Sequence, residues 1–230
     1  MPADELILLV GGQGTRLRRV VPDLPKPLAP VAGRPFIAWL LDRYALVGIR
    51  RVVLAAGYRA QQIRDVVGEQ WAGMDILYSV ENMPLGTGGA IRLAARLCQS
   101  DSVHVANGDT WLDYSPAALE EVTRDLDADA GLALAHVEDV GRYGRVDTRD
   151  RRVVRFAEKG DTGPGMINAG CYFLRAAAVA ALPEQGSCSF ERELLESWSG
   201  SGRLAAFTRT AGFIDIGVPE DYAAAQSAFA

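Results

Sequence analysis

The chain has 230 residues, of which 49% are hydrophobic and 23% charged, and its formal net charge is −5. This composition is typical of a folded globular protein and excludes a disordered, collagen-like or coiled-coil chain. The acidic balance argues against a non-specific nucleic-acid binder, which would show a basic excess. The apolar run 6–10 is far shorter than the roughly 18 residues of a membrane helix and lacks signal-peptide features. We therefore expect a cytoplasmic protein without membrane contact.

Cysteine and histidine are scarce. Cys98, Cys171 and Cys188 form no CxxC pair, and His104 and His136 each lie inside an apolar run. This pattern predicts buried thiols rather than a disulfide framework or a zinc site.

Buried strands alternate with helices in the first half of the chain. The apolar runs predict strands at 6–10, 51–55, 74–80 and 102–106. The segments between them predict helices at 36–47, 60–67 and 90–97. This order is typical of a parallel sheet with helices on both faces.

Three irregular segments follow the strands of this half. They are 11–34, which holds four prolines, the glycine-containing 81–89, and 107–113. Long loops in compact domains are usually functional, and ligands of open sheets bind at the carboxyl ends of the strands. We expect these segments to converge on one cleft.

The second half has a different pattern. It predicts strands at 131–137, 144–147, 153–158 and 167–174 with little helix between them, and a last helix at 220–229. We expect an antiparallel extension of the same sheet. The predicted fold is a single Rossmann-like three-layer α/β/α domain, 1–230, with a mainly parallel sheet.

The first strand leads into a glycine loop, Gly11-Gly12-Gln13-Gly14-Thr15-Arg16-Leu17. Its glycines allow backbone N–H groups to approach phosphate oxygens, and the planar guanidinium of Arg16 suits pyrophosphate. Leu17 stands where a dinucleotide fingerprint needs a third glycine, and the Walker pattern is absent. The alternative is a plain strand-to-helix turn.

Pro25-Lys26-Pro27 follows in the proline-rich segment. Pro27 disfavours the α region for Lys26, which predicts an extended backbone there. A lysine held in this way could meet a phosphate, although by itself a solvated lysine explains it better.

The motifs together resemble the sugar-1-phosphate nucleotidyltransferases, also called sugar-nucleotide pyrophosphorylases. GGQGTRL and PKPL are followed in order by PLGTGGA (84–90), NGD (107–109), EKG (158–160), NAGCYF (168–173) and FIDIGVPEDY (213–222). The string RRVVPDLPKPLAPVAGRPF (18–36) is most similar to the branch that makes GDP-heptose, the D-glycero-α-D-manno-heptose 1-phosphate guanylyltransferases. The resemblance implies the nucleotide-diphospho-sugar transferase fold, with a nucleotide half at about 1–113 and a sugar-phosphate half at about 114–230.

The resemblance also implies a role for individual residues. Arg16, Lys26 and Asp109 would be catalytic, and Asp109 and Asp215 would hold Mg²⁺. The nucleotide would contact Gly11, Gly12, Gly14, Thr15, Arg16, Glu81, Gly86, Gly89 and Asp109. The sugar phosphate would contact Lys26, Gly144, Glu158, Lys159 and Asn168.

The chemistry fits those residue types. A sugar phosphate oxygen that attacks an α-phosphorus is already an anion and needs no general base, so positioning and charge neutralisation suffice. Mg²⁺ takes few carboxylates and completes its coordination with phosphate oxygens and water. Guanine offers two adjacent donors that a carboxylate could accept, which makes Glu81 a candidate for base recognition, with a solvated loop glutamate as the alternative.

The expected substrates are GTP and a heptose 1-phosphate, whose product would supply a bacterial surface polysaccharide. UTP, CTP or dTTP with a hexose 1-phosphate is the alternative within the class. A glycosyltransferase would need an Asp-x-Asp pair, whereas Asp109 is followed by Thr110 and Trp111. A non-catalytic sugar-nucleotide sensor is the remaining alternative. The sequence leaves the oligomeric state open, with a homodimer as one option.

Overall fold

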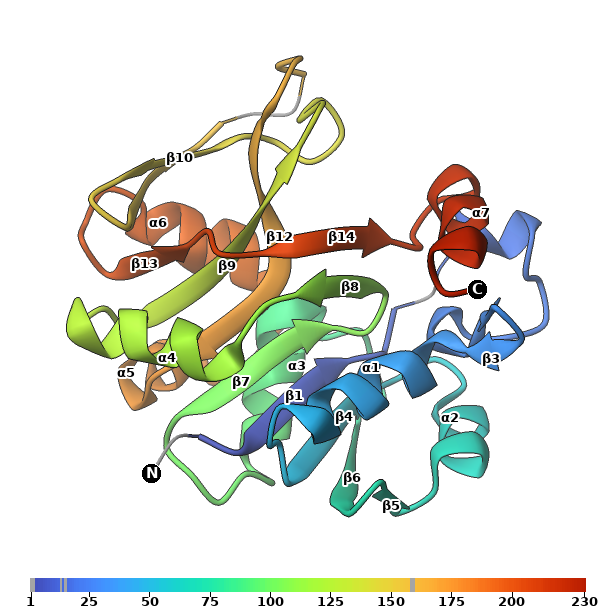
Figure 1. The fold of residues 1–230 in the computed structure, drawn as a ribbon. Coiled ribbons are helices and arrows are strands. Elements are labelled where there is room, and N and C mark those ends of the chain that lie inside the picture. Colours follow the sequence, from blue (N-terminus) through green and yellow to red (C-terminus); the bar gives the residue numbers. More distant parts are fainter. Residues whose placement is uncertain (1–2, 13, 15, 158–159) are drawn as a thin grey trace.

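The structure is a computed structural model that describes residues 3–12, 14, 16–157 and 160–230. A ten-stranded sheet runs through it in the order β10-β11-β13-β9-β12-β7-β1-β4-β6-β5 (Figure 1). In chain order its strands are β1 (Glu5–Leu9), β4 (Arg51–Ala56), β5 (Gln70–Trp71), β6 (Met74–Val80), β7 (Val103–Asn107), β9 (Ala130–Val137), β10 (Val146–Arg149), β11 (Arg152–Phe156), β12 (Gly165–Leu174) and β13 (Leu204–Phe207). Two small two-stranded sheets pair β2 (Pro30–Val31) with β3 (Arg34–Pro35) and β8 (Thr110–Asp113) with β14 (Ala211–Asp215).

Helices cover both faces of the large sheet (Figure 1). They are α1 (Phe36–Leu46), α2 (Ala60–Val67), α3 (Gly86–Ala95), α4 (Pro116–Asp125), α5 (Ala176–Ala180), α6 (Glu196–Trp198) and α7 (Pro219–Ala228), with 3-10 turns η1 (Leu17–Arg19) and η2 (Lys26–Leu28) and a π-helical turn η3 (Phe190–Leu195). Side chains of a strand point alternately to the two faces. Leu6 and Leu8 of β1 therefore pack in the core beneath α1, α2 and α4, and Ile7 packs in the core beneath α3, α5 and η3. The predicted α/β class with helices on both faces is confirmed.

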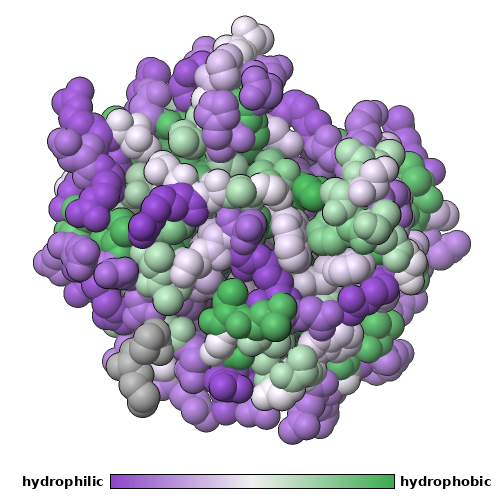
Figure 2. Space-filling view, viewed as in Figure 1, coloured by the Kyte–Doolittle hydropathy of each residue, from purple (hydrophilic) through white to green (hydrophobic). Residues whose placement is uncertain are grey.

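The surface above these cores is mixed. Figure 2 shows hydrophilic side chains over much of one face, with smaller groups of hydrophobic side chains between them. No helix in the described part of the chain is both long enough and apolar enough to span a bilayer.

The central strands β7, β1, β4 and β6 are parallel, as the sequence predicts, and each lies within one residue of its predicted bounds. Their carboxyl ends therefore lie along one edge. The outer strands are mixed: β12 runs antiparallel to β7 and β9, whereas β13 runs parallel to β9. The antiparallel extension is confirmed, and the sheet as a whole is mixed rather than mainly parallel.

The second half holds more helix than the sequence suggested. Helix α4 packs on this half of the sheet, and its start carries a recognisable signal that the prediction missed. The Ser115 hydroxyl accepts a hydrogen bond from the Ala118 N–H at 3.2 Å, and Pro116 occupies the first turn. Both residues are typical of helix N-termini. Strands β8, β13 and β14 were also missed.

Helix α3 begins at Gly86, earlier than the predicted start at residue 90. The glycines that suggested a turn serve close packing instead. The Gly88 N–H donates to the Cys188 carbonyl at 2.8 Å, and a Cβ at Gly88 would lie 2.8 Å from the Cys188 Sγ. Side-chain-free positions thus allow the helix to approach the segment before η3.

The described part of the segment 11–34 contains two short 3-10 turns, η1 and η2. Lys26 begins the 3-10 turn η2, so the predicted extended backbone at Lys26 is wrong. Leu28 donates to the Pro25 carbonyl at 2.8 Å and Ala29 to the Lys26 carbonyl at 3.0 Å. Proline fits such a turn because the first N–H groups of a helix have no internal partner. The last helix, α7, contacts this segment, because the Tyr222 hydroxyl donates to the Pro30 carbonyl at 2.6 Å.

Candidate active site

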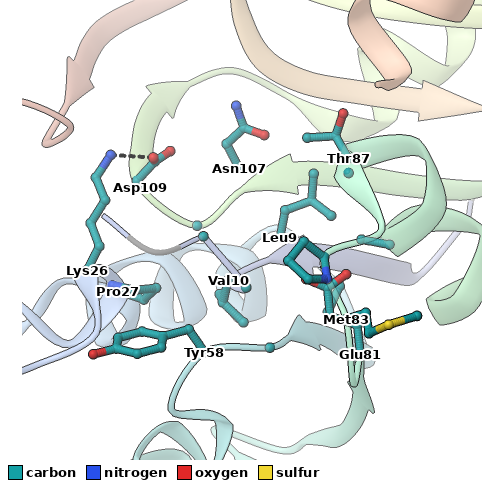
Figure 3. A pocket seen from close by; sticks show the side chains of 18 of the residues that line it. Leu9, Val10, Lys26, Pro27, Tyr58, Glu81, Met83, Thr87, Asn107 and Asp109 are labelled. Atoms are coloured by element: carbon teal, nitrogen blue, oxygen red, sulfur yellow. Dashed lines mark hydrogen bonds and ion pairs between the residues drawn. The ribbon is translucent and has the colours of Figure 1, made fainter. Parts of the chain in front are cut away.

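A cavity of about 600 Å³ lies at the carboxyl ends of the parallel strands. Its lining draws on all three irregular segments: Gly11, Gly12, Lys26 and Pro27 from the first, Glu81 to Pro84, Gly86 and Thr87 from the second, and Asn107 to Asp109 from the third. Figure 3 shows these side chains around one space, with Tyr58 below Val10. The predicted convergence on one cleft is confirmed.

Lys26, Asp109 and Asp215 form an acid–lysine cluster at one end of the cavity. The Lys26 ammonium pairs with the Asp109 carboxylate (Figure 3) and lies 3.7 Å from Asp215 Oδ1. The Lys26 side chain is 10% exposed, whereas the side chain of Asp109 is 34% exposed and that of Asp215 is 20% exposed. One cation is thus held between two carboxylates that still face solvent.

The pairing of β8 with β14 brings the two aspartates together. Asp215 lies opposite Thr110 in this antiparallel pair, and the Ile216 N–H donates to the Asp109 carbonyl at 3.0 Å. The sequence prediction missed both strands, although it identified the motifs NGD (107–109) and FIDIGVPEDY (213–222), which adjoin or overlap them.

The surroundings of Asp215 disfavour its charged form. Burial raises the pKa of this carboxyl, and the negative charge of Asp109 raises it further, while Lys26 acts in the opposite direction. The Gly217 N–H donates to Asp215 Oδ1 at 2.7 Å and helps to hold the carboxylate. The cluster is therefore a site of negative charge that only partly finds compensation within the protein.

Gly217 lies directly against the acid–lysine cluster. A Cβ at this position would lie 2.7 Å from Asp215 Oδ1 and 2.8 Å from Lys26 Nζ. With any other residue here, the Asp215 carboxylate or the Lys26 ammonium would have to shift.

The glycine loop reaches the cavity in part. Gly11 and Gly12 line it, and Gly14, at φ +58°, lies so close that a Cβ would be 3.0 Å from the Lys26 Cβ. The Arg16 side chain is exposed and lies outside the cavity lining. Thr15 lies outside the described residues. A phosphate-binding role of the loop stays a prediction.

Glu81 lies in the cavity wall, where it also supports the start of α3. Its Oε2 accepts a hydrogen bond from the Leu85 N–H at 3.0 Å, and its Oε1 lies against Gly57. A base contact by Glu81 stays a prediction. Gly86 lines the cavity, whereas Gly89 does not.

Of the predicted sugar-phosphate residues, Lys26 lines this cavity, whereas Gly144 and Asn168 do not. Asn168 lies on β12, and Gly144 is buried in the turn before β10, where its N–H donates to the Val140 carbonyl at 2.9 Å. Glu158 and Lys159 lie outside the described residues, so their predicted contacts stay untested.

The sequence prediction missed several lining residues as individual site residues. Tyr58, Asn82, Met83, Thr87 and Asn107 all line the cavity. The sequence feature that could have identified two of them is their position at the end of a predicted strand. Asn107 is the last residue of β7, and Tyr58 follows β4 by two residues. Ligands of open α/β sheets bind at that edge. Met83 lines the cavity and is 73% exposed.

The comparisons with known proteins agree with this geometry. The Nucleotidyl transferase family matches residues 5–230. A D-glycero-alpha-D-manno-heptose 1-phosphate guanylyltransferase from Aneurinibacillus thermoaerophilus is 40% identical over 96% of each chain, and one from Campylobacter jejuni is 36% identical over 95% of this chain and 96% of its own. The crystal structure of HddC from Yersinia pseudotuberculosis superposes with a TM-score of 0.86 at 35% identity, covering 99% of this chain and 100% of that chain. A second HddC structure, with a TM-score of 0.85, is complexed with GMP-PN.

Proposed function

The chain belongs to the nucleotidyl transferase family, and from this premise we propose that it transfers a guanylyl group from GTP to D-glycero-α-D-manno-heptose 1-phosphate. The products are GDP-heptose and pyrophosphate. The observation that supports the reaction class is the acid–lysine cluster at the edge of a cavity lined by a glycine loop. The choice of base and sugar rests on the relative that is 40% identical along 96% of both chains.

The proposed reaction is one displacement at phosphorus. A phosphate oxygen of the sugar 1-phosphate attacks the α-phosphorus of GTP, and the bond from that phosphorus to the bridging oxygen of the β-phosphate breaks. Pyrophosphate leaves with the electron pair. The nucleophile is an anion, so the enzyme needs no base and acts through positioning and charge neutralisation. Lys26 supplies a positive charge between the two phosphate groups, and Arg16 supplies one to the triphosphate.

Asp109 and Asp215 fit a magnesium ion. Mg²⁺ commonly takes one or two protein carboxylates together with phosphate oxygens and water, and these two carboxylates converge and remain partly exposed. When bound, Mg²⁺ would neutralise negative charge on the phosphates. The Lys26 ammonium balances the charge of the same two carboxylates within the protein. If Mg²⁺ took over this role, Lys26 would be free to pair with a phosphate.

The remaining site residues follow the same proposal. Gly11, Gly12, Gly14 and Thr15 would surround the triphosphate, and Glu81 and Gly86 would contact the guanosine. The sugar phosphate would contact Lys26 and Lys159, with Gly144, Glu158 and Asn168 at the sugar. We also propose a cytoplasmic location and use of the product in surface polysaccharide synthesis. A homodimer is our working expectation for the oligomeric state, which light scattering would measure.

Pyrophosphate release tests the substrates. The purified protein is assayed with Mg²⁺ and GTP, ATP, UTP, CTP or dTTP against heptose-, mannose- and glucose-1-phosphate. We expect GTP with the manno-configured heptose to give the highest kcat/KM, and Asp109→Asn to lower kcat by about 10²–10³. Asp113→Asn is the matched control, because this carboxylate at the end of β8 is 72% exposed and pairs only with Arg43 among the described ion pairs.

Other outcomes would revise the proposal in defined ways. Release with another nucleotide or sugar would keep the mechanism and replace the substrate. No release with any pair, with tight binding of a sugar nucleotide, would favour a sensor.

A further inference from the structure

A polar bridge connects the nucleotide cavity to β12. It begins at Thr87, whose hydroxyl donates to Glu191 Oε2 at 2.6 Å and accepts from the Phe190 N–H at 2.9 Å. Thr87 lines the cavity at the start of α3, and its partners belong to the π-helical turn η3. π-Helical turns are rare and occur frequently at functional sites. One cavity side chain is thus fixed by both the backbone and a side chain of η3.

The other end of the bridge is Asn168. Its amide Nδ2 donates to the Tyr172 hydroxyl at 2.9 Å. Tyr172 is 1% exposed, and its ring packs edge-on against Phe190 with centroids 5.1 Å apart. Burial raises the pKa of the Tyr172 phenol well above its usual range, and the nearby Glu191 carboxylate raises it further. The phenol therefore stays protonated between Glu191 and Asn168.

Asn168 is also fixed from its other side. β12 bulges between Asn168 and Cys171, and the Gly170 N–H donates to Asn168 Oδ1 at 3.0 Å. Gly170, at φ +69°, packs so closely on Asn107 that a side chain there would collide. β-Bulges commonly re-aim a side chain next to an active site. The bulge thus ends against Asn107, a second residue of the cavity lining.

These bonds set what Asn168 can still offer. An amide group has two N–H donors and an oxygen with two lone pairs. Tyr172 takes one N–H and Gly170 one lone pair, so one donor and one acceptor remain in a fixed orientation. That pair matches a sugar hydroxyl, which both donates and accepts. A freely rotating amide would present the same groups in many orientations.

We propose that Tyr172 is a positioning residue: together with Glu191 it fixes the orientation of Asn168 toward the sugar and ties this orientation to Thr87 in the nucleotide cavity. This inference rests on the proposed function, in which Asn168 contacts the sugar. It adds that the two substrate sites are joined through η3: Thr87 is hydrogen-bonded to Glu191 and to the Phe190 N–H, Phe190 packs on the Tyr172 ring, and the Tyr172 hydroxyl accepts from Asn168. A purely structural role would stabilise the fold without affecting substrate affinity.

Kinetics with two hydroxyl deletions test the bridge. Tyr172→Phe keeps the ring against Phe190, and we expect it to raise KM for the sugar 1-phosphate by about 5- to 10-fold, the effect of one lost hydrogen bond, with KM for GTP within twofold. Thr87→Val should raise the sugar KM in the same direction, although Thr87 lies in the nucleotide cavity. The double variant should cost no more than the larger single effect, because the bridge is already broken.

Tyr44→Phe is the matched control. Tyr44 is equally buried, and its hydroxyl contacts Tyr114 and Cys171 beneath the opposite helix layer. We expect unchanged KM values. An unchanged sugar KM in Tyr172→Phe within an active enzyme would overturn the bridge but not the proposed function, and so would a Thr87→Val effect confined to GTP.

A second readout does not need turnover. The side-chain amide resonance of Asn168, assigned by its loss in Asn168→Asp, should shift in Tyr172→Phe and also in Thr87→Val, but not in Tyr44→Phe. An Asn168 resonance that does not shift in Thr87→Val would overturn the coupling, even if the wild-type protein transfers no nucleotide.

Discussion

At the scale of single residues, the site depends on a charge arrangement that the sequence motifs indicated only in outline. The resemblance identified Lys26, Asp109 and Asp215, and the structure places all three in contact or near contact. The reason that they fit together lies in a residue with no side chain. Gly217 leaves the space in which the Asp215 carboxylate and the Lys26 ammonium meet.

Gly217→Ala tests this arrangement. The added methyl would lie within 3 Å of both Asp215 Oδ1 and Lys26 Nζ, so the cluster must shift. We expect kcat for pyrophosphate release to fall by at least about tenfold, because charge stabilisation is sensitive to small displacements. Gly141→Ala is the control, since its nearest new contact, the Asp161 carbonyl, is 3.3 Å away. Wild-type kcat in Gly217→Ala would show that the cluster tolerates displacement.

At the scale of elements, the regular periodic segments were predictable and the short connecting ones were not. Helix α2 and strand β6 match their predicted bounds because a clear apolar pattern defines them. Strands β8 and β14 are short, and they pair only with each other, so no buried run marks them. Yet these strands bring Asp215 to Asp109. The order of the motifs therefore identified Asp109 and Asp215 as site residues, but no local sequence pattern could predict that they lie close together.

The glycines at the start of α3 and the prolines around Lys26 led to two wrong predictions of local structure. Gly86 to Gly89 suggested a turn, because glycine normally weakens a helix. Contacts of α3 with Cys188 override that preference, and a sequence pattern cannot show them. Likewise, Pro27 only disfavours the helical region for Lys26, and the hydrogen bonds of η2 outweigh it.

Helix α4 offers a prediction on stability alone. Ser115→Ala removes the side chain that accepts from the Ala118 N–H, so one N–H at the helix start loses its partner. We expect the free energy of unfolding to fall by about 1 kcal/mol in a urea titration. The kinetic constants should not change, because Ser115 lies outside the cavity lining. A loss of kcat would mean that α4 contributes to the site.

At the scale of the whole molecule, stability should depend on pH through one buried imidazole. His104 is 1% exposed beside Phe173, and burial lowers its pKa to about 4, against the opposing charge of Glu120. The folded state therefore binds fewer protons than the unfolded state between about pH 4 and pH 6.5. Stability from this group is complete above pH 6.5 and is lost as the pH falls toward 4.

Chemical denaturation at several pH values measures this dependence. We expect His104 to contribute a slope of up to about 1.4 kcal/mol per pH unit within that window. His104→Leu should lose this part of the slope, while the carboxylates keep theirs. Equal slopes in the two proteins would contradict a neutral buried His104.

The central claim is that the acid–lysine cluster serves transfer of the α-phosphorus of GTP to a sugar 1-phosphate. The most direct measurement follows a radioactive label at that phosphorus with heptose 1-phosphate as acceptor. The account predicts that the label moves into GDP-heptose in the wild-type protein and stays in GTP when Asp215→Asn is used. Label released as GMP, or transfer that continues unchanged in Asp215→Asn, would contradict it.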